Sequence, residues 1–167
     1  MNDFPMALAL EQVHIDSCAF DPKNPPEEQE AALKIFEMGD KGFLDIGIAY
    51  STEKEIEHPK TPMWVKQKAL ELIYTVEVGL NEYEKRLLAE IGRVLVRNGK
   101  SRNHKNDAKH IFEAQKYGAH FITTDDRVLR KASQLQNLCS IRVFKPSEFL
   151  IFIMQFDEIA SPKGGSQ

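Results

Sequence analysis

The sequence predicts an α/β fold, in which helices cover both faces of a parallel sheet, because short apolar segments alternate with segments of helical periodicity. The first apolar segment, Val13–Ile15, ends abruptly at Asp16, as expected of a buried strand that runs into a loop. The clearest helix begins at Asn81, where Glu84 completes a capping-box pattern. It is followed by an apolar stripe at helical spacing, made of Tyr83, Leu87, Ile91, Val94 and Leu95.

The first half of the chain predicts two further strands and two further helices. A helix over Glu27–Met38 follows a proline-rich break, and Gly39 is its expected cap. Phe43–Tyr50 has the composition of a second strand. Thr61-Pro62 has the cap and first-turn proline of the next helix, and Thr75–Val78 is a short edge-strand candidate.

The second half continues the alternation of helices and strands. The helix that starts at Asn81 is expected to end at Asn98-Gly99. After a polar loop we expect a helix over Asn106–Tyr117 capped by Asn106, a strand at Phe121–Ile122, one helix from Asp125-Asp126 to about Gln134, a strand over Ile141–Phe144, and a closing helix from Pro146.

Composition predicts one soluble, cytoplasmic domain over residues 1–155, followed by a flexible tail over 156–167. The N-terminus lacks the pattern of a signal peptide, and the apolar run Phe149–Met154 is far shorter than the ~20 residues of a membrane span. We interpret this run as a packed helix, with a homodimer face as the alternative. Cys18 and Cys139 are expected to be reduced thiols. The net charge of −3 argues against a nucleic-acid packaging protein.

Acidic residues stand where several predicted strands end. Asp16 ends the first strand, Glu53 and Glu55 follow the second, and Asp125-Asp126 follow Phe121–Ile122. Asp107 lies in the first turn of a helix that runs back along the sheet, so that turn lies at the same edge. Ligand sites of open α/β sheets form at this edge. The topology therefore predicts that these separated acids meet.

Clustered carboxylates repel one another unless a cation compensates them, and hard oxygen ligands suit Mg²⁺ or Mn²⁺. Such ions polarise a phosphate and activate water. The sequence contains no glycine-rich phosphate loop, no Cys/His zinc pattern and no nucleophile-elbow serine. The alternative is that Asp107, Asp125 and Asp126 are first-turn acids favoured by the helix dipole, and that His14 is a core histidine.

Four segments resemble the motifs of PIN-domain nucleases over nearly the whole chain, from Val13 to Phe149. Val13–Ser17 resembles the opening motif of that family and Asn106–Ile111 its third motif. Phe121–Asp125 resembles the fourth motif, and Val143–Phe149 resembles the usual close of the family. The resemblance implies a three-layer α/β/α fold whose parallel sheet has the strand order 3-2-1-4-5.

The resemblance also implies a Mg²⁺- or Mn²⁺-dependent endoribonuclease acting on single-stranded RNA. By position, the catalytic acids and metal ligands are Asp16, Glu55, Asp107 and Asp125. Supporting positions are Ser17, Thr123 and Asp126. Many members of the family are toxins, so an antitoxin protein is an implied partner. The chain has Cys18 where many members have asparagine, and Glu53 and Glu57 compete with Glu55 for the second acid.

A basic cluster lies just before and within the helix that carries Asp107. The functional interpretation is an RNA-binding strip that contacts phosphates beside the metal, and the alternative is an ordinary exposed loop. Its members are Lys100, Arg102, His104, Lys105 and Lys109. Two other functions stay open from the sequence. One is a catalytically inactive PIN-like module that binds RNA or protein, and the other is a nuclease that acts on DNA or on a structured RNA end.

Overall fold

The computed structural model describes residues 11–49, 59, 63, 66–67, 79–96, 104–117 and 120–160. It confirms an α/β fold with a parallel sheet. Within the described part of the chain the sheet has four strands in the order β2-β1-β3-β4. Their bounds are β1 Glu11–Asp16, β2 Leu44–Ala49, β3 His120–Ile122 and β4 Val143–Phe144. The strand expected at Thr75–Val78 lies outside the described residues.

Strand β1 lies between β2 and β3 and runs parallel to both. Ile15 is opposite Ile48 of β2 and Ile122 of β3, and Asp16 is opposite Ala49 at the end of the ladder. Because all strands run in one direction, their carboxyl ends share one edge of the sheet. Asp16 therefore lies at the middle of the edge where ligand sites form in α/β proteins.

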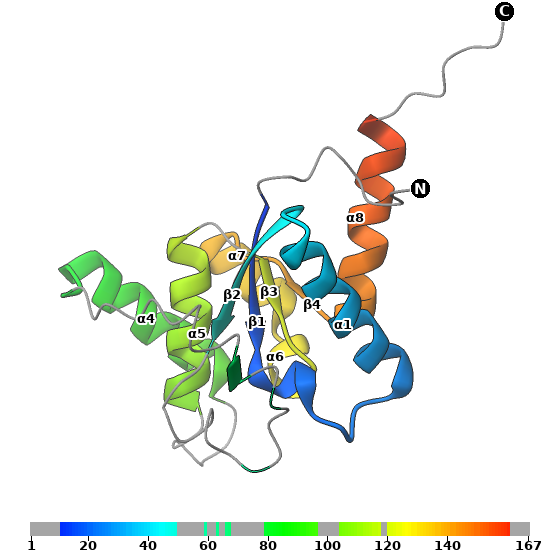
Figure 1. Cartoon of the computed structure of the whole chain (residues 1–167). Helices are drawn as coiled ribbons and strands as arrows, with labels where there is room; N and C mark the ends of the chain where they lie inside the picture. Colours follow the sequence, from blue (N-terminus) through cyan, green and yellow to red (C-terminus); the bar gives the residue numbers. More distant parts are fainter. Residues whose placement is uncertain are drawn as a thin grey trace, which may run out of the picture.

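Helices cover the sheet on both faces (Figure 1). On one face, α1 (Pro26–Asp40) and α8 (Pro146–Ala160) pack against each other. Their buried residues share a core with Val13, Ile15 and Ile122. The other face has α4 (Glu82–Leu95), α5 (His104–Lys116) and α7 (Ala132–Cys139), whose core includes Phe121 and Val143. Successive strand residues thus point to opposite layers.

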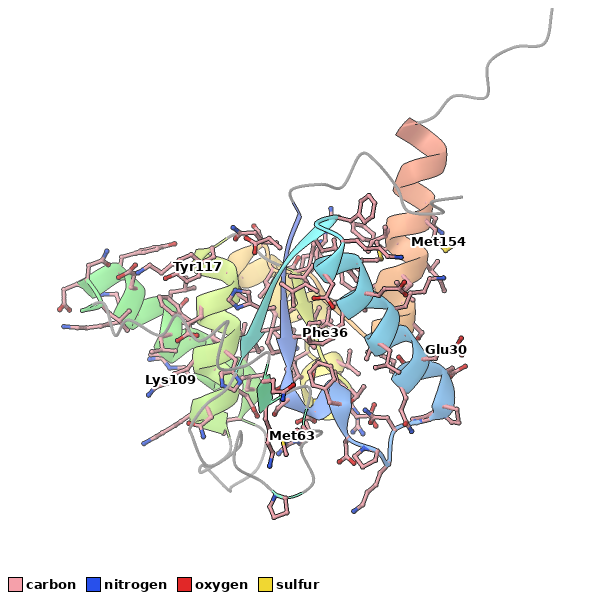
Figure 2. All side chains as sticks on the ribbon, in the orientation of Figure 1. Glu30, Phe36, Met63, Lys109, Tyr117 and Met154 are labelled. Atoms are coloured by element: carbon pink, nitrogen blue, oxygen red, sulfur yellow. The ribbon has the colours of Figure 1, made fainter. Side chains whose placement is uncertain are left out.

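Two short helices lie directly after strands. The 3₁₀ helix η2 (Ser17–Phe20) follows β1, and α6 (Asp126–Leu129) follows β3. Among the described helices, none combines the length and the apolarity needed to cross a bilayer. Figure 2 shows how side chains fill the space between the layers, with Phe36 of α1 buried and Met154 of α8 64% exposed.

The capping box at Asn81 is confirmed. The Asn81 side chain accepts the Glu84 amide at 2.9 Å, and the Glu84 carboxylate accepts the Asn81 amide at 2.9 Å. The helix buries Leu87, Ile91 and Leu95, as its periodicity predicts. Tyr83 was expected on the apolar stripe, but its side chain is 73% exposed because it stands in the first turn, beyond the facing layer. The helix ends at Leu95, before the predicted stop at Asn98-Gly99.

Other sequence predictions about helix boundaries are also wrong. Gly39 lies inside α1, whose C-cap is Lys41. The helix α5 begins at His104, so Asn106 lies inside its first turn and is not its cap. The single helix expected after Asp125 is divided into α6 and α7. At the junction the Lys131 amide donates to the carbonyl of Val128, three residues back, at 2.9 Å. Such tightening ends the first helix and redirects the chain. Val128 of α6 and Leu135 of α7 are both buried.

A buried carboxylate joins the two helices on the first face. Glu28 of α1 is only 5% exposed, and its oxygens accept the amide of Ser147 at 3.0 Å and the hydroxyl of Ser147 at 2.7 Å. Ser147 lies in the first turn of α8, whose amides have no partners within the helix. Glu28 therefore fixes the start of α8 against α1.

We expect Glu28→Ala to lower the free energy of unfolding by about 3 kcal/mol, at ~1.5 kcal/mol for each hydrogen bond to a charged group. Urea denaturation followed by circular dichroism measures this change. Glu27→Ala is the matched control, because Glu27 lies in the same turn and is exposed. Equal stabilities of the two variants would contradict a role for Glu28 in joining the helices.

Candidate functional site

The site is organised around Asp16, the last residue of the central strand. Val13 and Ile15 belong to the core beneath α1 and α8, so Asp16 points to the opposite layer, toward α5. Its side chain is buried, with 8% of the residue exposed. An ionised carboxylate in such a place needs hydrogen-bond donors around it.

Two side chains donate to the same oxygen of Asp16. The Thr123 hydroxyl donates to Oδ2 at 2.9 Å, and the Cys18 thiol donates to Oδ2 at 3.0 Å. Thr123 is fully buried, and its hydroxyl oxygen also accepts the amide of Asp125 at 3.1 Å. Thr123 thereby connects the carboxylate at the end of β1 to the segment after β3. Thr123 is one of the supporting positions that the family resemblance implies.

Cys18 takes part in this network as a protonated thiol. Burial, and next the negative charge of Asp16, raise the pKa of Cys18 to about 12. The thiol therefore keeps its proton at neutral pH and acts as a donor. Thr124 holds the cysteine in place, because its hydroxyl donates to the Cys18 carbonyl at 2.8 Å and its amide to the sulfur at 3.4 Å. Cysteine instead of asparagine at this position leaves Asp16 with a hydrogen-bond donor.

Asp107 and Asp125 come to Asp16 from two other elements. Asp107 is in the first turn of α5, and Asp125 caps α6 by accepting the Arg127 amide at 2.8 Å. Burial raises the pKa of Asp107 to about 6, and the charges of Asp16 and Asp125 add to this effect. Three carboxylates that are far apart in the sequence therefore share one electrostatic environment at the strand-end edge.

Arg127 is the cation that faces this group. Its guanidinium binds both carboxylate oxygens of Asp125, and one of its nitrogens lies 3.9 Å from Asp107 Oδ2. The side chain is 54% exposed, so it is free to move into solvent. Sequence reasoning missed Arg127. The available signal was an arginine two residues after an aspartate at a predicted helix start.

A second residue that sequence reasoning missed is His110. It lies three residues after Asp107 on α5, a spacing that places two side chains on the same helix face. Its Nδ1 is 4.0 Å from Asp16 Oδ1, the carboxylate oxygen that neither Cys18 nor Thr123 contacts. His14 lies two residues before Asp16 on β1 and is half-buried. Burial lowers its pKa, and its Nδ1 has no hydrogen-bond partner among the described residues.

Other predicted site residues are not brought to the acids in the described structure. Ser17 begins η2 and Asp126 begins α6, and the described hydrogen bonds connect neither side chain to Asp16, Asp107 or Asp125. Of the basic cluster, Lys105 and Lys109 are exposed on α5, and Figure 2 shows Lys109 projecting from that helix. The remaining predictions fall outside the described residues or side chains: Glu53, Glu55, Glu57, Lys100, Arg102 and His104.

The donor chemistry of the site fits a divalent cation. Within the described residues, no group of three or more His, Cys, Asp or Glu side chains is arranged to hold a metal ion as it stands. The three aspartates nevertheless supply the carboxylate oxygens that Mg²⁺ and Mn²⁺ prefer. Burial is the main cause of the raised pKa of Asp107, the charges of Asp16 and Asp125 raise it further, and the charge of Arg127 lowers it.

Comparison of the chain with protein-family models, with curated proteins and with solved structures gives no match. Function is therefore inferred from the residues of this chain alone.

The raised pKa of Asp107 predicts how stability depends on pH. Between its ordinary value of 3.8 and about 6, the folded protein binds more protons than the unfolded chain, so stability falls as pH rises through this window. Asp107→Asn removes the unfavourable charge. After solvent screening, we expect the substitution to raise the free energy of unfolding of the metal-free protein at pH 7 by roughly 1 kcal/mol. This corresponds to a melting temperature ~2–4 °C above that of wild type, and the difference should vanish near pH 4.

Thermal denaturation in a chelating buffer at several pH values measures this difference. Asp126→Asn is the matched control, since Asp126 is exposed and should leave the pH dependence unchanged. An Asp107→Asn protein that melts below wild type at pH 7 would instead make this carboxylate a structural residue.

Proposed function

We propose that this chain is a PIN-like, Mg²⁺- or Mn²⁺-dependent endoribonuclease that hydrolyses phosphodiester bonds of single-stranded RNA in the cytoplasm. One observation carries the proposal: Asp16, Asp107 and Asp125 converge from β1, α5 and the start of α6 at one edge of a parallel sheet. Charge repulsion within this group contributes to the raised pKa of Asp107. Keeping mutually repelling carboxylates is unfavourable for a fold, whereas a metal-dependent hydrolase needs them.

The arrangement of the sheet supports the same proposal. In the order 3-2-1-4-5 that the resemblance implies, the third strand is the one expected at residues 75–78. Without that strand, the order of the remaining four matches the observed order β2-β1-β3-β4. The segments that resemble the first and fourth PIN motifs end at the strand-end edge, and the segment that resembles the third motif begins there. Glu55 remains the proposed fourth acid, on the resemblance alone.

The aspartates have different tasks in this proposal. A bound Mg²⁺ or Mn²⁺ would polarise the phosphodiester and lower the pKa of an attacking water. Asp16 is held by Thr123 and Cys18, so it supplies a fixed oxygen. Asp107 must release the proton that its raised pKa favours, and Asp125 must exchange Arg127 for the metal. Lys105 and Lys109 are exposed near Asp107 on α5, where they would contact RNA phosphates.

One observation favours a second candidate function. Because Arg127 already pairs with Asp125 and lies near Asp107, the acids have a partial counter-ion without metal. A PIN-like module that no longer cuts, and binds RNA or protein, would keep such an arrangement. The role of toxin with an antitoxin partner rests on the family resemblance and requires the nuclease function.

The proposed nuclease predicts metal binding that depends on Asp16. In calorimetric titration we expect wild type to bind Mn²⁺ and Asp16→Asn to give no measurable binding, because the variant loses the charge at the centre of the group. A labelled pool of single-stranded RNA should be cut by wild type with Mn²⁺ and left intact by the variant. Parallel reactions with single-stranded DNA test the choice of nucleic acid.

Glu30→Gln, at an exposed position of α1, is the control for both assays, and it should bind and cut as wild type does. Metal binding without cleavage of any pool would favour the inactive binding module. An absence of Mn²⁺ binding to wild type would overturn the proposed nuclease.

A substitution at Arg127 tests whether its ion pair with Asp125 competes with a bound metal or has only a structural role. If the guanidinium competes with metal for Asp125, Arg127→Gln should bind Mn²⁺ several-fold more tightly than wild type and raise the pKa of Asp107 further, since Arg127 lowers it now. Calorimetry measures the affinity, and carboxyl carbon NMR measures the pKa. Arg130→Gln is the control, because Arg130 is an exposed arginine at the end of the same short helix. Weaker Mn²⁺ binding by Arg127→Gln would contradict this competition.

A further inference from the structure

His110 is buried beneath the group of acids, between α5 and the central strand. The residue is 4% exposed, and α5 packs against both β1 and β3. Among the described residues, neither of its ring nitrogens has a hydrogen-bond partner. Buried polar atoms of side chains are paired in most folded proteins, so an imidazole with two unpaired nitrogens requires an explanation.

Among the described residues, the carboxylate of Asp16 is within 4.0 Å of this ring. His110 Nδ1 lies 4.0 Å from Asp16 Oδ1. That distance is too long for a hydrogen bond, and a shift of roughly 1 Å would bring the atoms to the usual separation of ~2.9 Å. Asp16 Oδ2 already receives two donors, from Thr123 and Cys18. The imidazole is therefore placed to donate a hydrogen bond to the other oxygen, Oδ1.

We propose that His110 is a positioning residue for Asp16, an inference that rests on the proposed nuclease function for its effect on metal binding. In this arrangement the ring is the Nδ1–H tautomer, and it donates to Asp16 Oδ1. Donors on both oxygens prevent rotation of the carboxylate about its last torsion angle. The lone pairs that remain then point to the strand-end edge, where Asp107 and Asp125 also lie.

This role follows from the spacing on α5. Asp107 and His110 are three residues apart, so one helical turn carries both a carboxylate of the site and the support for another. Partners that orient metal-binding side chains in this way typically change metal affinity by roughly 10–100-fold when they are removed. A residue that only fills space would leave that affinity unchanged once the fold is preserved.

Two substitutions distinguish a His110 side chain that positions Asp16 from one that only fills space in the core. Leucine fills much of the same volume without a donor, whereas the Asn amide nitrogen takes nearly the place of Nδ1. We expect His110→Leu to bind Mn²⁺ about 10–100-fold more weakly than wild type, and His110→Asn to stay within about 3-fold of wild type, in calorimetric titrations. Melting temperatures of the metal-free proteins show whether both variants remain folded.

The hydrogen bond itself is testable without any metal. Long-range ¹H–¹⁵N NMR of the histidine rings in metal-free wild type should show protonated Nδ1 and unprotonated Nε2 for His110, assigned by the loss of its signals in His110→Asn. An unprotonated Nδ1 would overturn the proposal regardless of the Mn²⁺ affinities of the variants.

The remaining outcomes distinguish this inference from the proposed function. Wild-type Mn²⁺ affinity in folded His110→Leu would overturn the positioning role and leave the nuclease proposal intact. If wild type binds no Mn²⁺ but has the Nδ1–H tautomer, the proposed nuclease fails and the support of Asp16 by His110 stands.

Discussion

The structure depends on the burial of one carboxylate at the end of its central strand. Asp16 ends β1, which pairs with strands on both sides, so the residue has sheet beside it and helices above it. A buried charge of this kind is tolerated only where donors surround it. Thr123, Cys18 and the connection from Thr123 to the Asp125 amide satisfy this requirement. The same bonds fix how the segment after β3 approaches β1.

Much of this arrangement could be predicted from the sequence, because it follows from topology. Asp16 at the end of one apolar strand and Asp125 shortly after another predict acids at one edge of a parallel sheet, and the structure has Asp107 there as well. The capping box at Asn81 was equally predictable, since it depends on residues three positions apart. Local rules succeed where both partners are close in sequence or where the direction of the strands decides the outcome.

The parts that could not be predicted depend on contacts between distant side chains. The Cys18 thiol donates to Asp16, a contact that no local pattern indicates. The break between α6 and α7 lies at the turn where the Lys131 amide donates to the Val128 carbonyl, which periodicity over so short a segment does not reveal. The same holds for His110 and Arg127, whose roles come from their distance to acids on other elements. Glu55 lies outside the described residues, so its assignment stays a prediction.

The acids differ in how firmly they are held, and this difference is the strongest physical argument for a ligand. Asp16 is fixed by neutral donors, which keep its shape without cancelling its charge. Asp125 is paired with an exposed, removable arginine, and Asp107 favours a proton that neutral solution withdraws. A structural cluster would gain most from permanent, buried counter-charges. One rigid carboxylate beside two that are held less firmly is instead what a site needs if a cation is to enter, displace a guanidinium and find its first ligand already oriented.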